Sequence, residues 1–372
     1  MKVTLERASL LKSLGHVHRV VERRNTIPIL SNVLLRIGDG AIAFKATDLD
    51  MEVSEMVPAE IAQSGGVTAP AHTLYEIVRK LPEGSQVTFE STGETGQMTL
   101  RSGRSRFTLS TLPESDFPDL SVGEMPHRFE IAASVLKRLF DKTHFAISTE
   151  ETRYYLNGVF LHEMSSGNGS VLRAVATDGH RLARVETEAP QGAAGMPSVI
   201  VPRKAVAEIQ KLLEDQESDV TVELSATKIR ISAGPVVLTS KLIDGTFPDY
   251  QRVIPSGNDR MLLVDKEAFA RAVDRVSTIS SERGRAVKLS LTSGRLTLSV
   301  TNPDAGSATE ELEAEYDAPA LDIGFNARYL LDVLGQFDGE NALLKLAEPG
   351  SPTLMLEREG ASTLYVLMPM RV

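Results

Sequence analysis

Hydrophobic and polar positions recur along this chain in three similar blocks. Leu5, Ile131 and Val264 close three short apolar runs, which lie 126 and 133 residues apart. Apolar side chains follow each run at five and nine residues, and mostly basic side chains follow at seven and eleven. At about 100° per residue, the two pairs occupy opposite faces of a helix. The apolar positions are Leu10, Leu14, Leu136, Phe140, Phe269 and Val273, and the others are Lys12, His16, Arg138, Lys142, Arg271 and Arg275. The pattern predicts three equivalent strand–helix units, and such repetition decides the architecture.

A second strand–helix pattern recurs once in each block. Pro70, Pro202 and Asn326 end short apolar runs, and such residues suit the start of a helix. Apolar side chains follow at four, seven and eleven residues, which predicts helices over 72–81, 204–213 and 328–337. The side chains two residues after the start lie on the far face of each helix and are His72, Lys204 and Arg328.

Between the helices, alternating segments separated by glycine turns predict antiparallel sheet. In the first block they are 32–37, 41–45, 86–90, 97–100 and 106–110. Each block then has two helices and about eight short strands, which is an α+β arrangement. We predict three domains of this kind, over 1–125, 126–258 and 259–372.

Composition narrows the environment and the partners. The 372 residues contain no cysteine and no apolar run of the ~20 residues that a membrane span needs. The first strand begins at the N-terminus, so we expect a cytoplasmic protein without a signal peptide. The net charge of −10 alone argues against a nucleic-acid partner. The repeated basic helix face qualifies that argument, although such a face is also the ordinary solvated side of an amphipathic helix.

Motifs of known enzyme chemistry are missing from the sequence. It has no phosphate-binding Gly-Lys loop, no Gly-x-Ser-x-Gly turn and no His-Glu-x-x-His zinc site. Asp48 and Asp50 are interpreted as turn residues rather than a magnesium pair, and 166–170 as a hairpin loop rather than a phosphate cradle. Asp178 and His180 make a poor catalytic dyad, because no nucleophile accompanies them. We therefore expect no catalytic residue, metal or cofactor.

Several longer segments carry a resemblance to a known family. They are Thr26-Ile-Pro-Ile-Leu30, Arg101-Ser-Gly-Arg-Ser-Arg106, Ser110-Thr-Leu-Pro113, Asp116-Phe-Pro118, Arg153-Tyr-Tyr-Leu-Asn-Gly158, Ala176-Thr-Asp-Gly-His-Arg-Leu182, Phe247-Pro-Asp-Tyr250 and Met368-Pro-Met-Arg371. In this order they make the chain similar to the bacterial DNA sliding clamps, the β subunits of DNA polymerase III. The resemblance implies three clamp domains per chain and a head-to-tail homodimer that closes a six-domain ring around double-stranded DNA. It further implies a non-catalytic processivity factor that tethers the replicative polymerase.

The resemblance also implies DNA-contacting residues. The family's contacts map onto Arg24, Arg153, Tyr154 and Tyr155, and the predicted helix faces add Lys12, Arg138, Lys142, Arg203, Lys204, Arg271, Arg275 and Arg328. Such contacts would be independent of DNA sequence. Glu150 stands where the family has an uncharged polar residue, and His72-Thr73 replaces two basic residues, so both should weaken DNA contact.

A peptide-binding pocket between the second and third domains is implied as well. Its lining maps onto Leu156, Thr177, Gly179, His180, Arg181, Leu182, Pro248, Arg252, Val253, Val366, Met368, Pro369, Met370 and Arg371. The expected ligands are short peptides of the polymerase III catalytic subunit, the clamp loader and other clamp-binding proteins. Aliphatic and methionine walls suit such ligands. Without the resemblance, the final segment would be interpreted as an ordinary terminal strand.

The dimer requires complementary edges on the first and third domains. The basic candidates are Arg101, Arg104 and Arg106, the acidic ones are Glu310, Glu311, Glu313 and Glu315, and the apolar ones are Leu109 and Ile279. Two other hypotheses stay open from the residues alone. One is a metal-dependent nuclease that uses Asp48, Asp50, Asp178 and Asp304, and the other is a monomeric scaffold for proteins.

Overall fold

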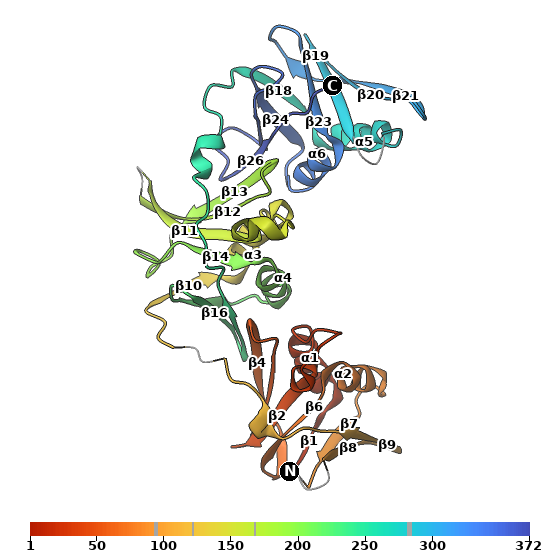
Figure 1. Ribbon diagram of the computed structural model, residues 1–372, viewed down its shortest axis with the longest axis vertical. Coiled ribbons are helices and arrows are strands. Elements are labelled where there is room, and N and C mark those ends of the chain that lie inside the picture. The colour runs from red at the N-terminus through yellow and green to blue at the C-terminus, as the bar shows by residue number, and fades with distance from the viewer. Residues whose placement is uncertain (93–95, 121–122, 167–168, 281–284) are drawn as a thin grey trace. The chain divides into compact units, whose positions relative to one another are not determined.

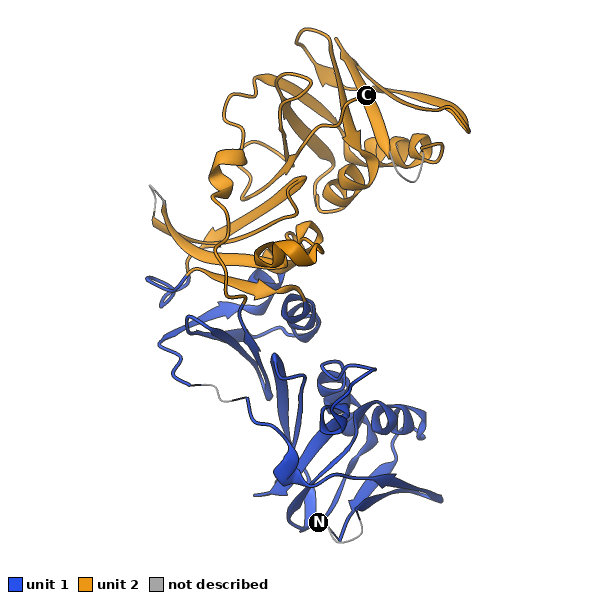
Figure 2. Ribbon diagram, in the orientation of Figure 1, with its two compact units in different colours: residues 1–137, 190–197, 204–242 blue, residues 138–189, 198–203, 243–372 orange. Residues whose placement is uncertain are grey.

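The computed structural model of the chain describes residues 1–92, 96–120, 123–166, 169–280 and 285–372. These residues form two compact units, coloured separately in Figure 2. One unit comprises 1–137, 190–197 and 204–242, and the other comprises 138–189, 198–203 and 243–372. The boundary runs through the middle repeat because that repeat contributes strands to a large sheet in each unit. The three predicted domain boundaries therefore stay predictions.

Two α-helices occur in each predicted repeat of the described chain (Figure 1). They are α1 (Arg7–Val17), α2 (Ala71–Lys80), α3 (Ala133–Asp141), α4 (Arg203–Leu212), α5 (Lys266–Ser277) and α6 (Ala327–Leu334). The predicted apolar faces are buried, as Leu10 and Leu14 show in α1 and Phe269 and Val273 show in α5. Helix α6 ends three residues before the predicted end, and Phe337 is buried from the turn that follows. None of the helices in the described ranges is long and apolar enough to cross a membrane.

The first unit contains two antiparallel sheets. The smaller has the order β5 (Glu60–Gln63), β1 (Lys2–Glu6), β7 (Gln86–Glu90), β8 (Gln97–Ser102), β9 (Ser105–Ser110). The larger has the order β10 (His127–Ala132), β15 (Asp219–Leu224), β16 (Lys228–Ala233), β17 (Val236–Lys241), β4 (Met51–Pro58), β3 (Ala41–Thr47), β2 (Asn32–Gly38), β6 (Gly65–Pro70). The strands predicted in the first repeat are therefore confirmed, with ends that differ by at most two residues.

The second unit also contains two antiparallel sheets. The larger has the order β14 (Val199–Pro202), β11 (Gly158–Ser166), β12 (Gly169–Thr177), β13 (Arg181–Glu188), β26 (Thr363–Leu367), β25 (Thr353–Leu356), β24 (Asn341–Leu346), β18 (Arg260–Asp265), β22 (Glu315–Tyr316). The smaller has the order β21 (Gly306–Glu313), β20 (Arg295–Asn302), β19 (Ala286–Thr292), β23 (Leu321–Asn326).

Neighbouring repeats are joined by one recurring kind of strand pair. Strand β4 of the first repeat pairs antiparallel with β17 of the second, with Glu55 opposite Val236. The equivalent strand of the second repeat, β13, pairs in the same way with β26 of the third, with Arg181 opposite Leu367. In the third repeat, the strand equivalent to β4 and β13 is β21. In the first repeat, the strand equivalent to β17 and β26 is β9. Both are the last strands of their sheets, so each leaves an open edge.

The aspartates considered as metal ligands form turns instead. Asp48 Oδ1 accepts hydrogen bonds from the amides of Asp50 and Met51, at 2.9 and 2.7 Å. Asp178 Oδ1 accepts the same two bonds one repeat later, from His180 and Arg181. A side chain that accepts amides two and three residues on is an Asx turn, which confirms the turn interpretation. Strands β11 and β12 pair as far as Ser166 and Gly169, while residues 167 and 168 of the predicted hairpin loop lie outside the described residues.

Candidate functional site

A cavity of about 190 Å³ opens in the second unit, where β13 meets β26. Leu182 and Val366 are paired across these strands, so their side chains form its apolar floor. The short helix η5 (Tyr250–Val253) and the Pro248–Asp249 segment before it form one wall. The full lining is Leu156, Thr177, Gly179, Arg181, Leu182, Pro248, Asp249, Tyr250, Val253, Val366 and Met368.

Two apolar side chains stand exposed at this cavity. Val253 is 47% and Met368 is 41% exposed, although both adjoin a buried apolar cluster that includes Leu182 and Val366. Apolar surface that continues a core outward into a concave site marks a binding surface. The cavity is therefore suited to an apolar ligand group.

The turn before β13 gives the cavity its shape. Thr177 Oγ1 donates to the carbonyl of Arg181, and the amide of Gly179 donates to Thr177 Oγ1. Gly179 has a φ of +88°, where residues with a side chain are strained. A Cβ there would also come within 2.8 Å of Nη1 of Arg153. Glycine adopts this conformation without strain, whereas the equivalent turn of the first repeat places Leu49 at a φ of +77°.

Arg181 is a fixed wall rather than a free cation. Its side chain is 9% exposed and donates to Asp178 Oδ2 at 3.1 Å and to the Phe145 carbonyl at 2.7 Å. A further bond runs to Asp332, and the guanidinium lies 4.3 Å from the centre of the Tyr329 ring. With its donors occupied, Arg181 supplies shape and stacking surface rather than net charge.

A second, polar cavity of about 420 Å³ shares Arg181 with the first. It is lined by His144, Phe145, Ile147, Ser148, Thr149, Glu150, Asp178, His180, Arg181, Arg203, Arg328 and Tyr329. Arg203 and Arg328 are both exposed there. Two exposed guanidinium groups at one polar cavity suit an anionic ligand such as a phosphate.

Several of the predicted basic residues are already engaged within the chain. In the second unit, Arg138 donates to the hydroxyls of Ser362 and Thr363, both at 2.9 Å, and Lys142 forms an ion pair with Asp338 at 2.8 Å. In the first unit, Lys204 bonds to Asp48 and Glu22. Burial alone would lower the pKa of Lys204, but these two carboxylates outweigh it and raise the pKa. The predicted basic helix faces are therefore only partly available to a ligand, because some of their cations are bonded within the chain.

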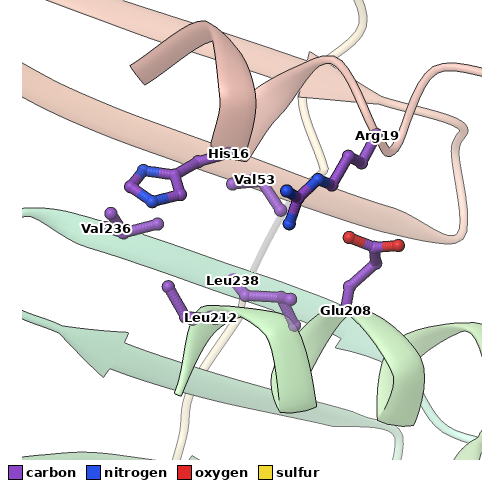
Figure 3. Close-up of a pocket in the computed structure, with 7 residues that line it drawn as sticks. All are labelled: His16, Arg19, Val53, Glu208, Leu212, Val236 and Leu238. Carbon is purple, nitrogen blue, oxygen red and sulfur yellow. The ribbon is translucent and has the colours of Figure 1, made fainter. Parts of the chain in front are cut away.

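His16 departs from the predicted exposed face. Its Nδ1 lies 2.8 Å from Oε2 of the buried Glu55. Figure 3 shows His16 beside a small cavity whose other lining residues are Arg19, Val53, Glu208, Leu212, Val236 and Leu238. The pairing of β4 with β17 brings α4 near the end of α1. Residues far apart in the sequence thus cover His16, which the helical periodicity predicted to face solvent.

Comparisons with known proteins match the whole chain. Models of the DNA polymerase III beta subunit match as its N-terminal domain over 1–121, its central domain over 130–249 and its C-terminal domain over 251–371. The chain belongs to the DNA polymerase III beta subunit family. Members of this family are non-catalytic polymerase subunits, so the nuclease hypothesis is wrong. Within the described ranges, no group of three or more His, Asp or Glu side chains could hold a metal ion.

Named beta subunits resemble the chain over its full length. The Beta sliding clamp of Caulobacter vibrioides is 54% identical over 372 residues, and that of Escherichia coli K12 is 38% identical over 375, with both chains fully covered in each case. A solved DnaN sliding clamp from Bartonella birtlesii, bound to griselimycin, matches with a TM-score of 0.97 at 55% identity and full coverage of both chains. A beta sliding clamp from C. crescentus matches with a TM-score of 0.98 at 54% identity, covering 100% of this chain and 99% of that one.

The structure brings most of the predicted pocket residues together. Nine line the cavity: Leu156, Thr177, Gly179, Arg181, Leu182, Pro248, Val253, Val366 and Met368. His180 lines the polar cavity instead and stacks on Tyr329, while Arg252 is exposed and paired with Asp249 at 2.8 Å. Pro369, Met370 and Arg371 are not in the lining, since the chain turns toward Gly324, whose carbonyl accepts from the Met370 amide. Asp249 and Tyr250 were missed, although the Phe247–Tyr250 motif contains them.

Some of the predicted edge residues are exposed, and others already form ion pairs within the chain. Arg101, Arg104 and Arg106 are exposed on β8, β9 and the turn between them. Glu313 and Glu315 are exposed, whereas Glu310 bonds to Arg275 and Glu311 pairs with Arg295 at 3.3 Å. The bond from Arg275 lowers the pKa of Glu310. Leu109 is only 9% exposed, while Phe107 of the same strand is 36% exposed and was missed by the sequence analysis. Ile279 is half-buried.

Proposed function

We propose that two copies of this chain close a ring around duplex DNA and tether the replicative polymerase, as a cytoplasmic processivity factor. Full-length similarity to beta sliding clamps supports this role. The observation that carries it is the recurring strand pair, β4 with β17 and β13 with β26. Strands β21 and β9 are the equivalents of these strands and, within the described chain, have no partner on one edge. Both edges become paired when β21 of one copy pairs with β9 of another. Two such contacts close a dimer.

The register of that contact follows from the two pairs already present. Extending the alignment of β4 with β17 places Ser105 opposite Glu310, and Arg104 opposite Glu311. Phe107 then lies opposite the small Ala308, which leaves room for its ring. The remaining charges, Arg101 and Arg106 on one edge and Glu313 and Glu315 on the other, add attraction of about 0–1 kcal/mol per exposed pair. Ile279 and Leu109 are the further apolar candidates for this interface.

The proposed DNA contacts are sequence-independent. Exposed Lys12 and Arg24 in the first unit support them, as do Arg153, Tyr154, Arg203, Arg271 and Arg328 in the second. Tyr155, Arg138, Lys142, Lys204 and Arg275 complete the proposed set, and the last four must give up existing bonds to reach a phosphate. Contacts to phosphates alone allow sliding, because every register of the duplex presents the same charges.

The cavity over β13 and β26 is proposed to dock short peptides of the polymerase catalytic subunit, the clamp loader and other proteins. Its lining residues, with His180, Arg252, Pro369, Met370 and Arg371 as flanking candidates, form the proposed surface. The apolar floor and the exposed Met368 support an apolar peptide anchor. Griselimycin, which is bound in the solved clamp from B. birtlesii, is the proposed probe of this pocket.

Retention on circular DNA tests the ring. A closed ring stays on a nicked circular plasmid after loading and leaves rapidly once a single restriction cut supplies ends. A protein that binds a site, or a monomeric scaffold, dissociates from both forms at the same rate. Equal dissociation of this protein from the circular and the linear form would contradict encirclement.

Replacing Glu150 with Gln is expected to tighten DNA binding. Glu150 lies 3.2 Å from Nε of Arg153, and both side chains are about half exposed. Because an exposed pair of this kind is worth about 0–1 kcal/mol, releasing Arg153 should raise DNA affinity by up to about five-fold. Fluorescence anisotropy with a labelled duplex at fixed salt measures the change.

The matched control for this variant is Glu151→Gln. It removes the same charge one residue away, at the first position of η4 (Glu151–Leu156), which Glu150 directly precedes. The long-range loss of repulsion is then common to both variants. Equal gains in the two variants would show that release of Arg153 contributes nothing.

A further inference from the structure

Tyr250 links the docking cavity to a buried chain of hydrogen bonds. Its ring lines the cavity wall and is 5% exposed. Its phenol oxygen lies 2.9 Å from Nη1 of Arg173 and 3.0 Å from Nε2 of His162. His162 Nδ1 lies 3.3 Å from the carbonyl of Glu163. Arg173 is 9% and His162 is 7% exposed, so all three polar groups sit out of water.

The chain of bonds has a single direction. A guanidinium only donates and a carbonyl only accepts. Arg173 must therefore donate to the Tyr250 oxygen, and Nδ1 of His162 must donate to Glu163. That leaves Nε2 of neutral His162 to accept the phenol proton of Tyr250. Every group in the chain is satisfied, and buried networks fix geometry when they are complete.

The series of hydrogen bonds that begins at Tyr250 ends in the sheet. Arg173 on β12 donates from Nε and Nη2 to Oε2 of Glu186 on β13, at 2.9 and 2.6 Å. On β11, Phe160 stacks on His162 with ring centres 4.6 Å apart, and on Phe247 at 4.7 Å. Tyr250 is therefore tied to three neighbouring strands that are hydrogen-bonded to one another.

The cavity wall has little else to hold it in place. The backbone bonds described for 247–254 stay within the segment, from Arg252 to Asp249 and from Ile254 to Gln251, at 3.4 and 3.3 Å. Pro248 has no amide proton to donate. Attachment of this wall to the sheet thus depends on side chains, chiefly the rings of Phe247 and Tyr250.

We propose that Arg173 and His162 are positioning residues of the docking pocket, which hold Tyr250, and through it the η5 wall, at the spacing that a bound peptide needs. This inference rests on the proposed docking function. Pro248 and Val253 contact the ligand in this arrangement, and Arg173 and His162 act on it only through Tyr250. An unanchored wall must be ordered when the ligand binds, which weakens binding.

The hydrogen bond between Tyr250 and His162 also makes the position of the η5 wall depend on pH. Burial lowers the pKa of His162, and the charge of Arg173 lowers it further, against the opposing effect of Glu163. The neutral ring is thus the folded form, and protonation comes only as the pH falls below the ordinary value near 6.5. The other charged groups of the cluster are Glu186, which is paired with Arg173, and Arg184, 3.9 Å from Glu186. A protonated His162 presents N–H to a phenol that already accepts from Arg173, so the phenol proton loses its acceptor.

Tyr250→Phe tests the proposal with griselimycin as the probe. The variant keeps the ring and removes the phenol oxygen. We expect the Kd of griselimycin to rise about ten-fold, which corresponds to the loss of a buried hydrogen bond. We also expect amides of 250–254 to exchange with solvent markedly faster. Tyr365→Phe is the matched control, because the buried Tyr365 hydroxyl has no partner among the described residues. It should leave both measurements unchanged.

A pH series separates positioning from simple packing. Wild-type affinity should fall as the pH drops below the ordinary histidine value near 6.5 and His162 becomes protonated, while the affinity of His162→Gln should not change over the same pH range. The Gln side chain can accept the phenol proton and does not titrate. Tyr250→Phe with wild-type affinity, or with unaltered amide exchange, would overturn the proposal. Griselimycin that binds Met368→Asp as tightly as the wild type would instead refute the docking pocket, and exchange at 250–254 would still decide whether the chain of bonds holds η5.

Discussion

Phe107→Asp is expected to convert the proposed dimer into a monomer of about 40 kDa, half the 80.8 kDa expected for two chains of 40.4 kDa. Phe107 is 36% exposed on β9, the open edge of its sheet. In the proposed interface its ring lies opposite Ala308 of the second copy. An aspartate there is buried without a partner, and an uncompensated buried charge costs about 3–5 kcal/mol. Each interface should weaken by at least about 100-fold, and a ring has two of them.

Sedimentation or light scattering measures the mass, and loss of retention on circular DNA reports the functional effect. Met56→Asp is the matched control, since Met56 is a 61% exposed apolar residue on another strand of the same unit. It should stay dimeric. A Phe107→Asp protein that remains dimeric at low micromolar concentration would show that β9 does not lie in the interface.

Met368→Asp is expected to reduce griselimycin binding by about 30-fold, or about 2 kcal/mol. Met368 stands at the docking cavity and is 41% exposed, so its side chain is available to a ligand. A carboxylate at that position must lose water when an apolar ligand group covers it. The fold should tolerate the change, since exposed substitutions usually alter stability by no more than about 0.5 kcal/mol.

Met261→Asp provides the comparison within the same unit. Met261 is 42% exposed, almost equal to Met368, but it lies on β18 and outside the docking cavity. Calorimetric titration of both variants, together with their thermal unfolding, separates a local effect from a general one. Equal weakening in the two variants, or none in Met368→Asp, would place the ligand elsewhere.

Much of the fold was predictable because its signals are local. The burial of Leu10 and Leu14, and of their equivalents in α5, follows from the 3.6-residue period of a helix. Asx turns need only the residue that accepts and the amides two and three positions later, so Asp48 and Asp178 were interpretable in isolation. The resemblance to clamps supplied nine of the cavity residues, but periodicity alone would have left the final segment as an ordinary strand.

Long-range contacts decided the rest. His16 was placed in solvent by its helix face, yet Glu55 lies 39 residues away and takes it as a partner. The cations of Arg138, Lys142 and Lys204 find acceptors from 156 to 225 residues away. No periodic pattern carries information about such partners, because an exposed position on one helix says nothing about which surface packs beside it.

The sequence by itself determined the three repeats, their helices and strands, and the turns that join them. Only the tertiary structure decided that β13 meets β26, which creates the cavity, and that Tyr250 is tied through Arg173 and His162 to the sheet. The physical reason is the range of the interactions. Helix and strand periods act between residues a few positions apart, whereas a binding surface forms where distant apolar faces meet and leave part of their surface uncovered.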